Sequence, residues 1–244
     1  IHETTCYMIE INSLSKSFGK LDVLKNVKLT LNPNQSVALI GPNGCGKTTL
    51  IKSILGMVLP DSGEIKFDGH KIRNQFQYRN EIGYMPQIGH YPENMTIGHI
   101  IEIMKEIRNS SKELDEDLLH AFKLKNMFDK KMRTLSGGTT QKVSATLAFL
   151  FDPKVLILDE PTAGLDPLAS EILKEKIIAE KQKGKIIMIT SHLLSELDDL
   201  INGLIYMQDG QILLDSPIEE VKVNTGQDAV SKAISHILKT MQHA

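Results

Sequence analysis

The stretch VALIGPNGCGKTTL, residues 37–50, decides how the rest of the chain is read. Its four leading apolar residues predict a short buried strand, and Lys47 then opens a predicted helix that runs to Leu55. The glycine-rich segment between strand and helix fits G-x-x-x-x-G-K-[ST], the phosphate-binding loop, in the setting that this motif requires. Glycines allow successive backbone N–H groups to face one anion, and the helix N-terminus adds further donors. We therefore predict a phosphate site formed by Gly41, Pro42, Asn43, Gly44, Cys45, Gly46, Lys47, Thr48 and Thr49.

Two side chains of this motif have expected roles. The Lys47 ammonium should reach the β and γ phosphates of a nucleotide, and the Thr48 hydroxyl should ligate Mg²⁺. Phosphate binding is therefore the first function that the sequence predicts.

Two apolar runs later in the chain end in polar side chains. The run VLIL, residues 155–158, precedes Asp159 and Glu160, and the run IIMIT, residues 186–190, ends two residues before His192. Such runs predict parallel strands buried on both faces, and the carboxyl ends of these strands meet at the edge where the phosphate loop also lies. At that edge Asp159 suits Mg²⁺, and Glu160 suits orientation or deprotonation of an attacking water.

Length and composition are those of an ordinary globular protein. The chain has 244 residues, 41% hydrophobic and 24% charged, which fits one large α/β domain or a domain with a smaller appendage. A formal net charge of −2 argues against a dedicated nucleic-acid binder. The two cysteines, Cys6 and Cys45, imply no disulfide framework and fit a reducing compartment. No apolar run approaches the roughly 18 residues that span a bilayer, so we expect a soluble protein, which leaves a membrane partner open.

A second glycine-rich segment, Leu135-Ser136-Gly137-Gly138, precedes a predicted helix over residues 139–151. Ser136 is a natural N-cap, and the two glycines expose the backbone N–H groups beside it. The segment is either a simple cap with a glycine-rich turn or a second anion site. Taken alone, it favours the simple cap.

The remaining segments supply supporting elements. Residues 8–31 and 64–72 predict antiparallel strands, and residues 96–150 are predicted to be mainly helical. Phe18 ends one predicted strand as either a packing or a base-stacking aromatic. Gln87 follows a strand that a proline ends, which places it at a strand edge.

The C-terminal tail predicts helices. Ser216 and Glu219 form a capping-box pattern with proline between them. Over residues 228–241 apolar side chains recur on one helical face. That face must dock on its own core, on a dimer mate or on another subunit, and the sequence does not choose among these.

Together these motifs resemble the nucleotide-binding subunit of ATP-binding-cassette (ABC) transporters over almost the whole chain. The family's motifs occur in its order: the phosphate loop, a glutamine loop at Gln87, the signature LSGG at 135–138, the carboxylates Asp159 and Glu160, a D-loop at Gly164-Leu165-Asp166, and a switch histidine at His192.

The resemblance implies an α/β fold, with a P-loop NTPase (RecA-like) core, an antiparallel β subdomain and a helical ABC insertion. It implies a single ABC ATPase domain over residues 1–244. Within it we expect an α/β core with antiparallel strands at 7–87 and 152–215, a helical subdomain at 88–151, and a C-terminal helical tail at 216–244.

For the site, the resemblance implies an ATPase that uses ATP and Mg²⁺. The metal ligands would be Thr48, Gln87 and Asp159, and the catalytic residues Lys47, Gln87, Glu160 and His192. Beyond the phosphate loop, nucleotide binding would involve Phe18 against the adenine, together with Ser136, Gly137, Gly138 and Asp166. The resemblance also implies a head-to-tail homodimer, in which Ser136 and Gly138 of one subunit meet the γ phosphate held by Lys47 of the other.

Two positions depart from the family pattern. Thr139 and Thr140 stand where a glutamine usually follows the second signature glycine, which softens the expected contacts but keeps Ser136 and Gly138. Cys45 replaces the usual small Ser or Ala of the phosphate loop. We favour a small residue tolerated for its backbone N–H. The alternative is a reactive thiol whose alkylation abolishes nucleotide binding.

Within the family, the runs IGYMPQ, YPENMTI, TTQKVSA and DPLAS are similar to the ATPase subunit of transporters that serve copper-site assembly of nitrous oxide reductase. That likeness implies a polytopic membrane permease as partner, with a periplasmic accessory protein reached through it; the net charge already argues for no nucleic-acid partner. It implies a cytoplasmic location, peripheral on the inner face of the cell membrane. Four residues are of types that bind soft metals: His90, Met95, His99 and Met104. No two of them lie at a spacing typical of a metal-binding motif, so we favour core and loop roles for them.

Alternative functions differ in which motifs they use. An ABC ATPase for another cargo would use the same motifs. A soluble non-transport ABC ATPase would usually carry a coiled-coil insertion or a second cassette, and neither is present. A kinase with only the phosphate loop has no use for LSGG, D-loop and His192 together, and a binding-only cassette does not need Glu160.

Overall fold

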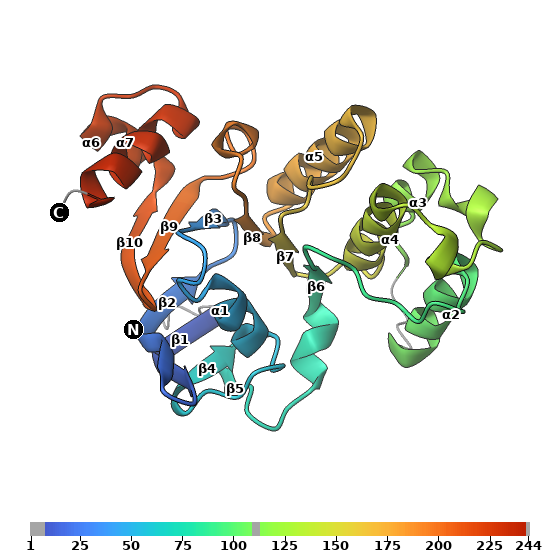
Figure 1. The fold of residues 1–244 in the computed structure, drawn as a ribbon, viewed down its shortest axis with the longest axis horizontal. Helices are drawn as coiled ribbons and strands as arrows, with labels where there is room; N and C mark the ends of the chain where they lie inside the picture. Colours follow the sequence, from blue (N-terminus) through green and yellow to red (C-terminus); the bar gives the residue numbers. More distant parts are fainter. Residues whose placement is uncertain (1–7, 109–112, 243–244) are drawn as a thin grey trace, which may run out of the picture.

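The computed structural model describes residues 8–108 and 113–242, the last three by their backbone only. A six-stranded sheet in the order β10-β9-β3-β8-β7-β6 lies at its centre (Figure 1). The pairs β9–β3, β3–β8, β8–β7 and β7–β6 are parallel, and β10 is antiparallel to β9. The strands are β3 (Ser36–Ile40), β6 (Ile82–Met85), β7 (Val155–Asp159), β8 (Ile186–Thr190), β9 (Gly203–Gln208) and β10 (Gln211–Pro217).

Both faces of this sheet are covered, as the all-apolar runs predict. Along β7, Leu156 and Leu158 belong to one core cluster, whereas Val155 and Ile157 belong to the other. Helices α4 (Gly137–Phe149) and α5 (Pro167–Gln182) contribute to the first cluster, and α1 (Lys47–Ile54) contributes to the second. Strand ends at the carboxyl edge are therefore held by two packed layers.

A second, antiparallel sheet packs on the α1 side with strand order β2-β1-β4-β5 (Figure 1). Its strands alternate buried and exposed side chains, as the sequence predicts for 8–31 and 64–72. A short helix, η1 (Gln77–Glu81), leads from it into β6. The strands are β1 (Ile9–Phe18), β2 (Leu21–Leu31), β4 (Ser62–Phe67) and β5 (His70–Lys71).

Helices between β6 and β7 form a group at the β6 edge of the central sheet (Figure 1). They are α2 (Ile97–Arg108), α3 (Asp117–Ala121), η2 (Leu124–Met127), η3 (Met132–Thr134) and α4. Their buried side chains belong to the same core cluster as β7 and β8. The mixed α/β fold class is confirmed, whereas the domain boundaries stay a prediction.

The C-terminal tail docks on its own core, which resolves the alternatives that the sequence left open. Val230, Ala233 and Ile234 of α7 (Val230–Gln242) are buried in the cluster that also holds β7 and β8. The helix lies against η4 (Leu194–Glu196) and α6 (Ile218–Thr225). The predicted capping box is wrong: α6 begins at Ile218, and Ser216 instead contacts the Glu220 carboxylate at 2.9 Å from within β10.

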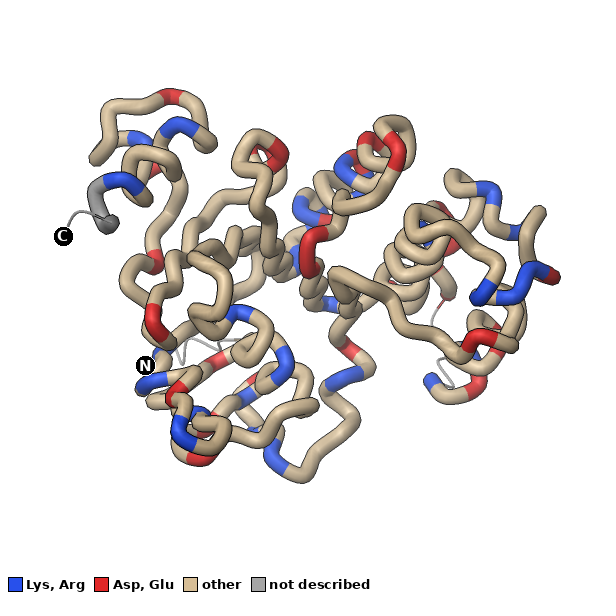
Figure 2. The backbone as a smooth tube through the Cα atoms, viewed as in Figure 1, with Lys and Arg blue, Asp and Glu red and all other residues tan. Residues whose placement is uncertain are grey.

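Charged residues are interspersed along the whole chain. In the view of Figure 2, acidic and basic residues alternate along the backbone. In the part of the chain that the structure describes, no helix combines the length and the hydrophobicity needed to cross a membrane.

Candidate functional site

The phosphate loop connects the end of β3 to the start of α1. Gly41 packs so closely on the Met207 backbone that a Cβ would overlap its carbonyl oxygen. Gly46 is the N-cap of α1 with φ 110°, and a Cβ there would come within 2.7 Å of the Val23 carbonyl oxygen. The loop therefore requires glycine at both positions, because β2 and β9 hold its backbone tightly.

The loop leaves its phosphate-binding groups accessible. Lys47 Nζ donates to the Gly41 carbonyl at 2.7 Å and to the Pro42 carbonyl at 3.1 Å. Thr48 is exposed, and so are the loop residues Pro42, Asn43 and Gly44. An anion above the loop would meet both the ammonium and the backbone N–H groups that open the helix.

Cys45 points away from this surface. Its side chain is 4% exposed and belongs to the core cluster beneath the sheet. Its Sγ lies 3.9 Å from Lys47 Nζ. Burial limits access of an alkylating reagent to the thiol, which favours the interpretation of a tolerated small residue. Cys6, the other cysteine, lies outside the described residues.

Polar groups gather at the carboxyl ends of β7 and β8, as the sequence predicts. The Thr190 hydroxyl donates to Asp159 Oδ1 at 2.5 Å. The Glu160 N–H in turn donates to the Thr190 carbonyl and hydroxyl oxygens, both at 3.1 Å. Glu160 has φ 53°, a conformation that non-glycine residues seldom adopt. Thr190, which the sequence analysis did not single out, thus fixes the backbone turn that aims Glu160.

Glu160 forms an ion pair with His192, whose Nε2 lies 3.0 Å from Oε1. Glu160 is 15% exposed and His192 is 54% exposed. Burial raises the pKa of the Glu160 carboxyl, Asp159 and Glu196 raise it further, and His192 and Lys47 oppose the rise. A carboxylate with a raised pKa is a better proton acceptor, so this environment suits a general base.

A second contact restrains the segment that follows Glu160. The Thr162 hydroxyl donates to the carboxylate of Glu196, on η4. Lys174 of α5 lies 3.8 Å from the same carboxylate. Neither Thr162 nor Glu196 was predicted from the sequence. The signal that could have indicated them is that each is a polar residue within a few positions after Glu160 or His192.

The signature segment is exposed on another part of the surface. Ser136 caps α4, as predicted, and its Oγ accepts from Thr139 N–H at 3.3 Å. A Cβ on Gly138 would lie 2.7 Å from the Gly164 carbonyl oxygen, so the signature packs closely on the D-loop. Ser136 and Gly137 of this segment are exposed, as are Pro42, Asn43 and Gly44 of the phosphate loop.

The D-loop aspartate is tied to the signature helix. Asp166 Oδ1 accepts from the Ala169 N–H at 2.9 Å and so caps α5, while Oδ2 accepts from Lys142 Nζ at 2.6 Å. The hydrogen bond from Lys142 lowers the pKa of Asp166. The sequence did not predict Lys142; a basic residue one helical turn after the signature was the signal.

Phe18 and Gln87 lie at the periphery of this group. Phe18 is 52% exposed at the end of β1, with Lys16 Nζ 5.4 Å from its ring centre. Gln87 is exposed and follows β6, in which Met85 lies opposite Leu158 of β7. Gln87 therefore leaves the sheet at the same edge as Asp159, while Phe18 belongs to the antiparallel sheet.

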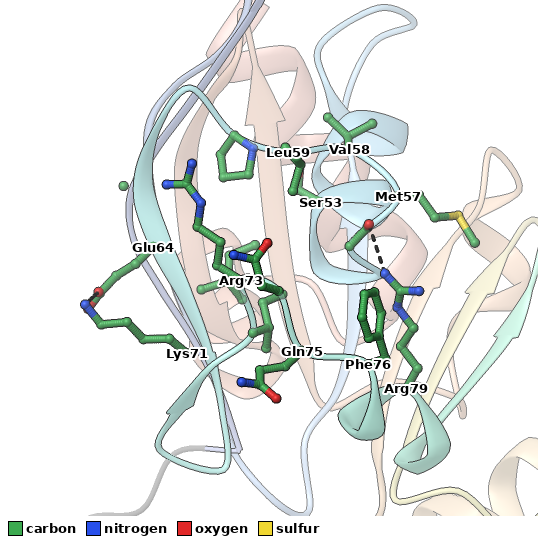
Figure 3. A pocket seen from close by; sticks show the side chains of 16 residues that line it. Ser53, Met57, Val58, Leu59, Glu64, Lys71, Arg73, Gln75, Phe76 and Arg79 are labelled. Atoms are coloured by element: carbon green, nitrogen blue, oxygen red, sulfur yellow. Dashed lines mark hydrogen bonds and ion pairs between the residues drawn. The ribbon is translucent and has the colours of Figure 1, made fainter.

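Two pockets differ in their relation to these groups. A cavity of about 210 Å³ lies between the phosphate loop and the His192 segment, and Leu238 of α7 lines it as well. A larger one of about 510 Å³ lies beyond the C-terminal end of α1 (Figure 3). Arg79 closes one side of the larger pocket by donating to the Gly56 carbonyl at 3.0 Å, and Met57 and Phe76 remain more than 60% exposed beside it. This larger pocket contains none of the predicted catalytic residues.

A strand–glycine loop–helix unit, with two carboxylates at the end of another parallel strand of the same sheet, defines a P-loop NTPase. Comparison with known proteins narrows the class. The family model for the ABC transporter matches residues 24–163. The lantibiotic transport ATP-binding protein SrtF of Streptococcus pyogenes is 33% identical over 208 residues, which cover 85% of this chain and 90% of that protein.

Two further matches agree. The Nod factor export ATP-binding protein I of Burkholderia lata is 31% identical over 228 residues, 91% of this chain and 75% of that protein. A solved ATP-binding subunit of an ABC transporter superposes with a TM-score of 0.86 at 27% identity, covering 95% of this chain and 99% of the other. The chain therefore belongs to the ABC transporter family, as an ATP-binding subunit that is an ATPase.

Proposed function

We propose that this subunit hydrolyses ATP at the phosphate loop and that Glu160 acts on the attacking water. The observation that carries the proposal is the ion pair of Glu160 with His192, 3.0 Å apart, within electrostatic reach of Lys47. Lys47 would balance charge that develops on the phosphates, and His192 would hold the γ phosphate. Glu160 would orient the water or take its proton.

The residues proposed for the metal fit Mg²⁺ chemically. A hydroxyl from Thr48, a carboxylate from Asp159 and an amide oxygen from Gln87 are all hard oxygen ligands. The Thr190 hydrogen bond fixes the orientation of the Asp159 carboxylate. When bound, the ion would neutralise negative charge on the phosphates.

We further propose that two copies assemble head to tail around ATP. The support is the exposure of Ser136 and Gly137, which gives each chain a second anion-binding segment that a neighbouring copy could use. In this arrangement Ser136, Gly137 and Gly138 of one copy complete the site that holds the nucleotide on the phosphate loop of the other. Phe18 is proposed to stack the adenine, and Asp166 is proposed to lie at the interface.

A polytopic permease is the proposed membrane partner, with this subunit on the cytoplasmic, inner face of the cell membrane. The relatives named for lantibiotic transport and for Nod factor export support a role in transport. Exposed apolar side chains support a partner surface: Met57, Leu59, Phe76 and Ile88 are each at least 60% exposed.

For the cargo, we propose copper-site assembly of nitrous oxide reductase, with a periplasmic accessory protein reached through the permease. The support is the sequence likeness of runs such as TTQKVSA and DPLAS. The relatives above are named for other cargoes, so this proposal rests on the likeness alone. Cargo contact would belong to the permease, because this chain contributes the nucleotide site.

Two experiments test these proposals separately. An affinity-tagged chain, expressed in its native host, should retain a polytopic membrane protein after mild detergent extraction; a soluble eluate without one would contradict the transporter role. Deletion of the coding gene should leave nitrous oxide reductase depleted of copper, and plasmid-borne wild type, but not the Lys47→Ala variant, should restore it. A fully copper-loaded reductase in the deletion strain would overturn the cargo while leaving the ATPase intact.

A further inference from the structure

We propose that Thr139 is a positioning residue, which by donating to Ser136 Oγ holds the Ser136 hydroxyl in the orientation that donates toward an anion on another subunit. The inference rests on the head-to-tail arrangement proposed above and concerns a residue that departs from the family's usual glutamine. Thr139 itself touches no phosphate in this proposal and acts through Ser136.

The contact between the two side chains is direct. Ser136 Oγ lies 2.9 Å from Thr139 Oγ1, in addition to accepting the Thr139 N–H at 3.3 Å. Ser136 has extended backbone angles, φ −69° and ψ 158°, which are those of an N-cap. Ser136 and Gly137 are exposed, so the third direction around the Ser136 oxygen is open to the outside of the molecule.

The number of hydrogen bonds that a hydroxyl can make determines where the Ser136 proton points. A serine hydroxyl has one donor and two acceptor positions. When Thr139 donates its O–H to Ser136, its N–H and O–H occupy both acceptor positions. The Ser136 proton then has no partner on its own helix and points outward as a donor. The opposite orientation would turn that proton back onto Thr139, so an approaching anion selects the first.

Threonine suits this role better than a long amide side chain. Its hydroxyl sits on a β-branched carbon with few allowed χ1 rotamers, so holding the hydroxyl beside Ser136 costs little conformational entropy. The signature of this chain thus replaces a flexible glutamine with a short, stiff donor. Serine, which keeps the hydroxyl but is less restricted, is the conservative substitute.

The test uses nucleotide-dependent dimerisation, measured by light scattering with MgATP in the Glu160→Gln background, where hydrolysis is expected to be blocked. Thr139→Val removes the hydroxyl and keeps the shape. We expect it to weaken the dimer by up to about five- to tenfold per site, because the Ser136 hydroxyl is then no longer held in its donor orientation; the worth of one whole hydrogen bond sets the upper end of that range. Thr139→Ser should restore most of the affinity. ATP binding to the monomer should not change, because the phosphate loop is distant in the sequence and intact.

Thr140→Val is the matched control. Thr140 is the next residue on the same helix, and in the described part of the chain its hydroxyl makes no hydrogen bond, while its carbonyl accepts from Ser144. This control should dimerise like the parent. A double variant separates positioning from general damage: Ser136→Ala with Thr139→Val should be no weaker than Ser136→Ala alone, because Thr139 acts only through Ser136.

The outcomes distinguish this inference from the arrangement on which it rests. If Thr139→Val dimerises like the parent, or if it weakens the Ser136→Ala variant further, Thr139 is not a positioning residue, although the head-to-tail dimer stands. If the Glu160→Gln parent itself fails to dimerise with MgATP, the arrangement is overturned and the role of Thr139 with it.

Discussion

At the carboxyl ends of β7 and β8, Asp159 and Glu160 meet His192 at the surface, whereas the amino ends of the same strands carry a buried network of charges around Glu180. Helix α5 joins the two ends, because Asp166 caps its start and Glu180 lies in its last turn. Glu180 is fully buried, and Lys176, Lys183 and Lys185 all pair with it. Acidic and basic side chains therefore occur at both ends, but the buried Glu180 pairs with three lysines, whereas Glu160 pairs with a single, exposed histidine.

The amino end resembles a cation site only in its acids. Carboxylate oxygens of Asp115, Asp152 and Glu180 lie within 4.8 Å of one another. Each, however, is paired with a lysine: Asp115 with Lys176 at 2.5 Å, and Asp152 with Lys185. These lysines already supply the positive charge. At the carboxyl end Lys47 is partly exposed and His192 is 54% exposed, and neither is enclosed by a network of opposite charges, which is why that end is the one proposed for catalysis.

The largest expected effect is the loss of ATP hydrolysis when Glu160, at the carboxyl end, is replaced. Glu160→Gln keeps the shape of the side chain but removes its ability to accept a proton. ATP hydrolysis should fall by about 10²- to 10⁴-fold, the range that a general base contributes, while ATP binding persists. Steady-state phosphate release and equilibrium nucleotide binding measure the two quantities.

The matched control for this variant lies at the amino end. Glu180→Gln, assayed well below its unfolding temperature, should keep the wild-type turnover number. Wild-type hydrolysis by Glu160→Gln would disprove the assignment of the base.

The next largest effect concerns folding stability, to which Glu180 at the amino end should contribute more than Glu160 at the carboxyl end. Replacing Glu180 with glutamine removes the buried carboxylate that Lys176, Lys185 and the half-exposed Lys183 share, while Asp115 and Asp152 remain as partners of Lys176 and Lys185. Removing one partner of a buried ion pair typically costs about 3–5 kcal/mol. Urea unfolding at neutral pH should show a loss of this order for Glu180→Gln and little loss for Glu160→Gln. Equal stability of the two variants would show that the network is not a source of folding free energy.

Acid should weaken the network in a defined direction. Burial alone raises the pKa of Glu180, but hydrogen bonds from Lys183, Lys185 and Lys176 outweigh it and lower the pKa to about 2, from an ordinary value of 4.5. The folded state therefore binds fewer protons than the unfolded state between these values. The contribution of Glu180 is fully present above about pH 4.5 and is lost toward pH 2, on the order of 3 kcal/mol.

Comparison with Glu180→Gln isolates this contribution from the other carboxylates. The difference in unfolding free energy between wild type and variant should shrink as the pH falls from 5 to 2. A difference that stays constant over this range would exclude titration of Glu180 as its source.

The contrast between the two ends also explains what the sequence could predict. The phosphate loop, Asp159, Glu160 and His192 follow apolar strands directly, so a local pattern places them at one edge of the sheet. The fold class followed from the same strands. Ser136 was recognisable as a cap from its own neighbours. These predictions depend on short-range order along the chain.

The parts that escaped prediction depend on contacts between distant segments. Lys176 and Asp115 are 61 residues apart, and Lys142 and Asp166 are 24 apart, so no local pattern pairs them. The docking of α7 required the three-dimensional position of η4. The Ser216 capping box failed because strand β10 continues through Pro217: Ser216 pairs with Leu204 of β9, and its hydroxyl donates to the Glu220 carboxylate of α6.

The smallest expected effect is a pH shift at the carboxyl end, and its sign differs between two neighbours of Glu160. His192 lowers the pKa of the Glu160 carboxyl and Glu196 raises it. His192→Ala should therefore move the acid limb of kcat/KM for residual hydrolysis to higher pH, because Glu160 then holds its proton more tightly. Glu196→Gln should move the same limb to lower pH. Full pH profiles of the three proteins measure both shifts.

Opposite displacements are what distinguish an electrostatic effect from general damage to the site. A loosened turn would change both variants in the same direction, since His192 and Glu196 each restrain the segment around Glu160. If the acid limbs of the two variants shift in the same direction, or if neither shifts, the base that limits kcat/KM at low pH is a group other than Glu160. Because Glu180 lies at the opposite end of α5, Glu180→Gln should leave the acid limb where it is in the wild type.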